Sequence, residues 1–67
     1  MKISFIGSGK MAEALISGIT ESHTLSANSI NCTDKDDNKT TYLNKKYKIN
    51  KYTNNLDAIK NANIIFI

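Results

Sequence analysis

Gly7-Ser8-Gly9-Lys10-Met11-Ala12 is the stretch that decides the fold, because it joins two segments with different hydrophobic periods. Before it, residues 2–6 have the β-branched and aromatic content of a short strand. After it, residues 10–20 place apolar side chains at three- and four-residue steps, which predicts an amphipathic helix. We expect the apolar face of that helix to consist of Met11, Ala14, Leu15, Gly18 and Ile19.

The same alternation of strand and helix continues to the end of the sequence. Residues 30–33, 49–52 and 64–67 read as strands, and the last of these is wholly apolar, as expected of a strand buried on both faces. Helices are predicted near residues 36–47 and 56–62, the first capped by Asp36, Asp37 or Asn38 and the second by Thr53, Asn54 or Asn55. The predicted fold class is therefore α/β, a parallel sheet in the order β-α-β-α-β-α-β that stops after the fourth strand.

Composition excludes several classes of function. The chain has 67 residues, and with one cysteine and one histidine it offers neither an internal disulfide nor a protein-only zinc site. The net charge of +3 comes from scattered lysines without any arginine, so we expect no nucleic-acid surface. No apolar run approaches the ~18 residues of a membrane span. We expect a cytoplasmic protein without a bound metal.

The glycine-rich turn fits the pattern G-x-G-x-x-G/A between a strand and a helix. Gly7 permits the tight turn, Gly9 lets a pyrophosphate approach the backbone, and Ala12 lets the helix pack closely on the strand. Amide groups at the start of the helix would then face the anion, and Lys10 adds a positive charge there. The pattern predicts a site for a dinucleotide, NADP or NAD.

The end of the second strand should contact the adenosine ribose of that cofactor. Asp34 is placed to bind the 2′-hydroxyl of NAD, whereas Thr33 and Lys35 are placed to hold the 2′-phosphate of NADP. Asp34 is also suited to cap the turn before the second helix. The residues leave the choice between NADP and NAD open.

Residues 2–18 (Lys-Ile-Ser-Phe-Ile-Gly-Ser-Gly-Lys-Met-Ala-Glu-Ala-Leu-Ile-Ser-Gly) resemble the start of pyrroline-5-carboxylate reductase. The run Met-Ala-Glu-Ala-Leu after Gly9-Lys10 is more specific than the glycines alone. Residues 55–59 and 62–67 are similar to the third helix and fourth strand of that family. The resemblance spans the whole sequence but only about the first quarter of such an enzyme.

This resemblance implies reduction of 1-pyrroline-5-carboxylate, a small-molecule substrate, to L-proline by hydride transfer from NADPH or NADH. It also implies that residues 1–67 are the N-terminal part of a Rossmann-like domain. A C-terminal helical domain, absent from these residues, would supply homo-oligomer contacts and most of the substrate site. Asn55 falls where the family often has an asparagine that touches the cofactor, although a helix cap is its other reading. The implied cofactor-binding residues are Gly7, Ser8, Gly9, Lys10, Met11, Ala12, Thr33, Asp34, Lys35 and Asn55.

One position departs from the family, because Lys10 stands where Asn or Gln is usual. No residue is assigned a catalytic role, since His23 has no partner at a motif spacing and Cys32 reads as a small buried hydrophobe. Two alternatives to the resemblance remain. One is a related NADP-dependent reductase of the 6-phosphogluconate-dehydrogenase-like or deazaflavin-dependent kind, and the other is a non-catalytic, truncated nucleotide-binding remnant.

Overall fold

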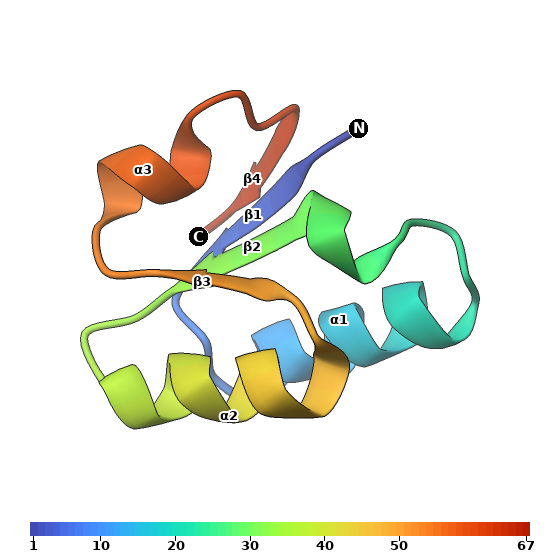
Figure 1. Cartoon of the computed structure of the whole chain (residues 1–67), viewed down its shortest axis with the longest axis horizontal. Coiled ribbons are helices and arrows are strands. Elements are labelled where there is room, and N and C mark those ends of the chain that lie inside the picture. The colour runs from blue at the N-terminus through green and yellow to red at the C-terminus, as the bar shows by residue number, and fades with distance from the viewer.

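The computed structural model describes all residues, 1–67, and its strands and helices alternate along the chain (Figure 1). A single turn of 3₁₀ helix precedes the second strand at Ala27–Ser29. The strands are β1 (Ile3–Ile6), β2 (Ile30–Thr33), β3 (Asn50–Tyr52) and β4 (Ile64–Phe66). The helices are α1 (Lys10–Glu21), α2 (Asp37–Tyr47) and α3 (Asn55–Ile59). Each strand and each helix begins within two residues of the position that the sequence predicts.

The four strands form one parallel sheet in the order β3-β2-β1-β4. The register pairs Phe5 of β1 with Cys32 of β2 on one side and with Phe66 of β4 on the other. Strand order therefore reverses beside β1, because β2 and β3 extend to one side of it and β4 lies on the other. The predicted α/β class with a parallel, Rossmann-like sheet is confirmed.

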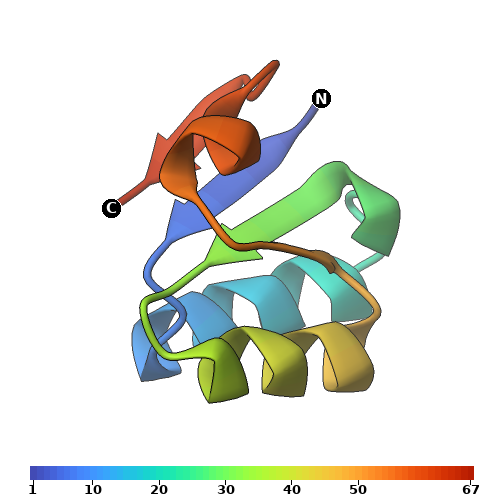
Figure 2. The same ribbon diagram turned by 60° about the vertical axis from the view of Figure 1, so that its left-hand side comes forward.

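Helices cover the two faces of this sheet unequally (Figures 1 and 2). Helices α1 and α2 lie side by side on one face, and the short α3 lies on the opposite face. Right-handed crossovers from β1 to β2 and from β2 to β3 place the first two helices together, and the return to β4 places α3 on the other side. The N-termini of all three helices consequently lie at the carboxyl edge of the sheet.

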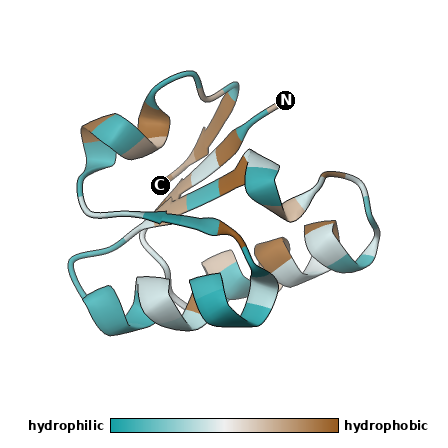
Figure 3. Ribbon diagram, in the orientation of Figure 1, coloured by the Kyte–Doolittle hydropathy of each residue, from teal (hydrophilic) through white to brown (hydrophobic).

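The core lies between the sheet and the α1–α2 layer. It comprises the buried side chains Ile3, Phe5, Ile16, Ile30, Cys32, Leu43 and Ile49. Colouring by hydropathy shows apolar residues on β1, β2 and β4 and along α1, while β3 and α2 are mostly hydrophilic (Figure 3). Thr40 and Leu43 are the residues that α2 buries.

The opposite face carries a row of polar side chains beneath α3. Ser4 and Asn31 are buried there, and the Ser4 hydroxyl donates to the carbonyl of Ala58 in α3. The Asn31 amide donates to the Ser4 hydroxyl at 3.2 Å, and the Asn50 amide donates to the Asn31 oxygen at 3.0 Å. Because the hydrogen-bonding capacity of these buried groups is satisfied, the row fixes α3 on the sheet instead of destabilising it.

The buried face of α1 differs from the predicted one. Ile16 is fully buried and Ala12 and Ile19 pack against the core, whereas Met11 and Leu15 are exposed. The face of α1 that packs on the core is thus turned about the helix axis by ~100°, the angle between successive residues, from the predicted apolar face. Met11 and Leu15 extend toward β4, where no helix lies beside α1 on this face.

Two further predictions are wrong in detail. Helix α3 ends at Ile59 and not near Ala62, because Lys60 adopts an extended conformation (ψ 125°) and the following Asn61 a left-handed one (φ 63°). Strand β4 is not buried on both faces: it is an edge strand paired only with β1, and Phe66 is 41% exposed. An apolar run cannot distinguish an edge strand from an interior strand, because neighbours and not composition determine burial.

Candidate dinucleotide site

The turn after β1 owes its shape to glycine. Gly7 has φ of +101°, a region that side chains with a Cβ rarely adopt. Its N–H donates to the carbonyl of Thr33 at 2.8 Å, which ties the turn to the end of β2. The sharp change of direction carries the chain from the edge of the sheet directly into α1.

Ser8 strengthens this attachment between the turn and β2. The residue is buried, and its hydroxyl donates to the same Thr33 carbonyl at 3.1 Å. Its N–H donates to Oδ2 of Asp34 at 2.7 Å. The glycine turn therefore has a defined conformation before any ligand arrives.

The start of α1 presents unpaired amide groups beside that turn. Glu13 is the first residue of the helix whose N–H donates to a backbone carbonyl, that of Gly9 at 3.0 Å. The preceding amides of residues 10–12 have no such partner, and Gly9 offers no capping side chain. Free N–H groups and the helix dipole together favour an anion at this position.

Gly9 leaves open space where a ligand would approach those amides. A Cβ built on Gly9 would meet no protein atom within 4 Å, and the residue has an ordinary extended conformation (φ −82°). The fold itself therefore does not require glycine here. A phosphate lying against the backbone supplies a reason for it, so the loop fits the pyrophosphate of a dinucleotide.

The predicted ribose residues gather in a hollow of about 290 Å³ beside the turn. The exposed Lys35 lies at its rim, while Thr33 is buried at the end of β2. The structure thus brings together side chains from β1, β2 and α3 at the carboxyl edge of the sheet. The hollow is lined by Ile6, Gly7, Thr33, Asp34, Lys35 and Asn55.

Asn55 belongs to this hollow and not to the cap of α3. The cap is Asn54, whose side chain accepts a hydrogen bond from the N–H of Asp57 at 2.8 Å. Asn55 is the first helical residue, and its exposed side chain is free of that task. Of the two readings of Asn55, the structure excludes the helix cap and leaves the ligand contact as a prediction.

The Asp34 carboxylate is held by backbone donors on both of its oxygens. The N–H of Asp36 donates to Oδ1 at 2.8 Å, and Ser8 donates to Oδ2 as described above. These two bonds, that of Asp36 foremost, hold the pKa of Asp34 below its ordinary value of 3.8. Asp34 does cap the turn before α2, and it also reaches across to the glycine turn.

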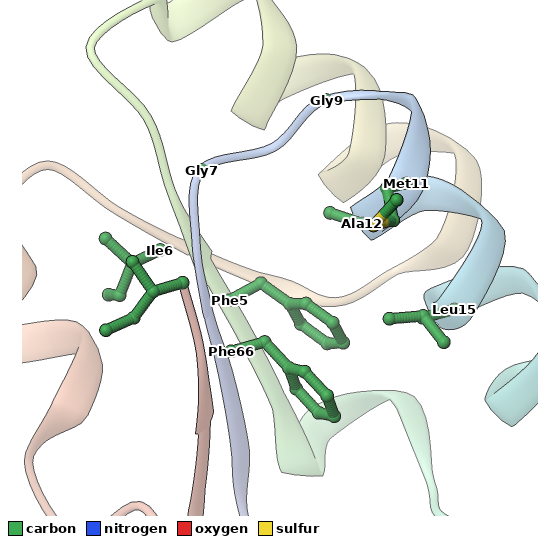
Figure 4. Close-up of a pocket in the computed structure, with 9 residues that line it drawn as sticks. Phe5, Ile6, Gly7, Gly9, Met11, Ala12, Leu15 and Phe66 are labelled. Carbon is green, nitrogen blue, oxygen red and sulfur yellow. The ribbon is translucent and has the colours of Figure 1, made fainter.

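Met11 and Ala12 line a second hollow, of about 240 Å³, on the other side of the glycine turn (Figure 4). Its floor is the stacked pair Phe5 and Phe66, whose ring centroids are 5.1 Å apart. Leu15 completes the wall, and the lining is almost entirely apolar. Asp34, Lys35 and Asn55 thus line the hollow on the β2 side of the glycine turn, and Met11 and Ala12 line the hollow on the β4 side. Lys10 is exposed at the start of α1 and lines neither hollow.

A polar cluster joining α1 to α2 was not foreseen from the sequence. Oε2 of Glu13 accepts from the hydroxyls of Tyr42 at 2.7 Å and Tyr47 at 2.9 Å, and Lys46 Nζ lies 3.4 Å away. The Tyr42 bond is the main reason that the pKa of Glu13 is lowered. The ammonium of Lys46 also lies over both tyrosine rings. No sequence motif pairs residues 29 to 34 positions apart, so only the packing of the helices reveals the cluster.

The other chemically reactive residues lie away from the loop surface. Cys32 is buried in β2, and burial raises the pKa of its thiol. His23 is exposed in the turn after α1. The structure shows no group of three or more side chains arranged to hold a metal ion, and none of its helices could span a bilayer.

A parallel sheet with a glycine turn and open helix start at its switch point defines a dinucleotide-binding domain of the Rossmann type. The comparison with family models agrees with this class. The chain belongs to the family described as NADP oxidoreductase, coenzyme F420-dependent, which it matches over residues 2–67. It therefore represents the NADP-binding domain of a family of NADP-dependent oxidoreductases. A comparison with curated proteins found no significant match.

Proposed function

We propose that the chain is the NAD(P)H-binding portion of a pyrroline-5-carboxylate reductase, the enzyme that reduces 1-pyrroline-5-carboxylate to L-proline. The single observation that supports cofactor binding is the open start of α1 at Gly9, with its free amides aimed at empty space. The choice of reductase rests on residues 11–15, Met-Ala-Glu-Ala-Leu, directly after that loop. Glu13 within this run also serves the packing of α1 on α2.

Each residue of the site has a defined task in this proposal. The amides of residues 10–12 bind the pyrophosphate, and Lys10 adds charge at the same end of α1. Lys35 faces the 2′-phosphate of NADP across the polar hollow, and Asn55 contacts the adenosine ribose from the opposite wall. Ser8 and Thr33 keep the loop in place through the hydrogen bond between them.

The cofactor supplies the hydride when it is bound, and the residues of this chain bind and orient it. None of them is positioned as a proton donor for the substrate, so we assign no catalytic residue. We further propose that the reductase acts as a homo-oligomer on its small-molecule substrate, through parts of the enzyme outside residues 1–67.

A second candidate is a deazaflavin-dependent NADP reductase, and the family description, which names coenzyme F420, favours it. The two candidates differ in what accepts the hydride from NADPH. The intact reductase that carries residues 1–67 is incubated with NADPH and either 1-pyrroline-5-carboxylate or oxidised coenzyme F420, and L-proline and reduced F420 are quantified. The proposal predicts L-proline in the first reaction and no reduced F420 in the second.

The reverse outcome would replace the proposed reductase by the deazaflavin-dependent one. NADPH binding with no product in either reaction would favour a non-catalytic nucleotide-binding remnant. A direct binding titration with NADPH is therefore performed alongside the two reactions. Failure of the protein to bind NADPH would overturn both candidates together.

A further inference from the structure

The carboxylate of Asp34 spans two loops that are far apart in the sequence. One oxygen accepts from the N–H of Asp36 within its own loop, and the other accepts from the N–H of Ser8 at 2.7 Å. Ser8 lies in the middle of the glycine turn and is 5% exposed. The side chain of Asp34 thus occupies a backbone donor that belongs to the phosphate loop itself.

The other bonds that hold the loop do not depend on side-chain chemistry at the end of β2. Gly7 and the Ser8 hydroxyl both donate to the backbone carbonyl of Thr33, which any residue would provide. Of these bonds, only the one between the Ser8 N–H and Asp34 requires a particular side chain at the end of β2. Removing the carboxylate would therefore leave the Ser8 N–H without its acceptor and loosen one side of the turn.

A carboxylate that recognises a ribose must direct its oxygens at the sugar hydroxyls. In this chain both oxygens of Asp34 already face backbone donors, and these donors fix the orientation of the group. The neighbouring Lys35 and Asn55 are exposed and line the same hollow without such restraints. Lys35 and Asn55 are therefore the side chains of the hollow that are free to turn toward a ribose, whereas the orientation of Asp34 is set by the loop.

We propose that Asp34 is a positioning residue, which holds the phosphate loop in its binding conformation through Ser8 and does not bind the ribose. This inference rests on the proposed binding of NADP. It explains how an acidic side chain at the end of β2 is compatible with a family that uses NADP, because the charge is directed at the loop and away from the 2′-phosphate.

Ligands that differ only at the ribose test the inference. The affinities of ADP, 2′-deoxy-ADP and inorganic pyrophosphate are measured for the wild-type protein, Asp34→Ala and Asp34→Asn. Asp34→Ala is expected to weaken all three by the same factor, about tenfold, because the loop binds the phosphates that they share. Asp34→Asn should fall between the other two proteins, since its amide oxygen can still accept from Ser8.

If Asp34 instead bound the 2′-hydroxyl, Asp34→Ala would weaken ADP but leave 2′-deoxy-ADP and pyrophosphate unchanged, and the inference would be wrong. Asp37→Ala is the matched control, because it removes the same charge from the first turn of α2 without touching the loop. It should leave the affinities for all three ligands within about twofold of the wild type.

Amide hydrogen exchange provides a readout without any ligand. Exchange at Ser8 should become at least tenfold faster in Asp34→Ala and remain unchanged in Asp37→Ala. Unchanged protection of Ser8 in Asp34→Ala would overturn the inference even if affinities fell. Failure of the wild-type protein to bind NADPH would instead overturn the proposed function, so the two failures are distinguishable.

Discussion

Gly9→Ala separates the needs of the fold from the needs of the ligand. The new methyl group would meet no protein atom within 4 Å, and φ at Gly9 is −82°, which alanine adopts freely. Alanine is a poorer N-cap than glycine, but it also reduces the entropy of the unfolded chain by about 0.4–1 kcal/mol. These effects oppose each other, so the free energy of unfolding should change by less than about 0.5 kcal/mol.

The affinity for NADPH should respond very differently. The methyl group stands where the pyrophosphate approaches the amides of residues 10–12, and displacement of the phosphate weakens at least one charge-assisted hydrogen bond. Such a bond is worth about 1.5–3 kcal/mol, which corresponds to a loss of about 10- to 150-fold in affinity. Titration followed by the fluorescence of NADPH measures this loss directly.

Gly18→Ala is the matched control, because it adds the same methyl group to the same helix. A Cβ on Gly18 also meets no atom within 4 Å, but this residue lies far along α1 from the loop. The Gly18→Ala substitution should raise the free energy of unfolding by about 0.8–1 kcal/mol. The variant should bind NADPH with the affinity of the wild type. Equal affinity of Gly9→Ala and Gly18→Ala would refute the assignment of the loop.

Three other predictions concern the rim of the site and the stability of the fold. Asn54→Ala should lower the free energy of unfolding by about 0.5–2 kcal/mol in thermal melts. Asn55→Ala should weaken NADPH binding about 2- to 12-fold. If Asn55→Ala destabilised the fold and Asn54→Ala weakened binding, the cap geometry would be contradicted. Glu13 stabilises the fold above its ordinary pKa of 4.5, and this contribution is lost as pH falls through its lowered pKa in the folded state. In Glu13→Gln the melting temperature should therefore decline less steeply below pH 4.5. An unchanged pH profile would show that the Glu13 carboxylate does not accept the hydrogen bonds of Tyr42 and Tyr47. Leu43→Ala should lower the free energy of unfolding by about 2–5 kcal/mol, so that circular dichroism shows much of the chain unfolded. A native-like melt would show that Leu43 does not lie in the core.

The strand and helix pattern could be predicted because the hydrophobic period changes at Gly7 and again at each later turn. The position of the polar hollow followed as well, since parallel strands bring the ends of β1 and β2 to one edge. Local signals could not settle the buried face of α1, because Met11, Leu15 and Ile16 are equally apolar. Only the absence of a helix beside α1 over β4 decides that Ile16 is buried and Met11 is not.

The role of Asp34 shows a second limit of the sequence. From its position after β2, the sequence predicts either a contact with the ribose or a cap of the turn before α2. Neither interpretation includes a bond to the glycine turn. The bond to Ser8 joins residues 26 positions apart, and it depends on the conformation of the glycine turn. The assignment of Asn54 and not Asn55 as the cap of α3 likewise depends on where the helix begins.

The most direct test of the account is a titration of ¹⁵N-labelled protein with NADPH, followed by the shifts of its backbone amides. The account predicts that the largest shifts fall on residues 9–12, with a second group at Thr33–Lys35 and Asn55. Amides of the α1–α2 cluster around Tyr42 should shift little, because they lie away from the loop. Shifts confined to Phe5, Leu15 and Phe66 of the apolar hollow, or spread evenly over the chain, would contradict the account.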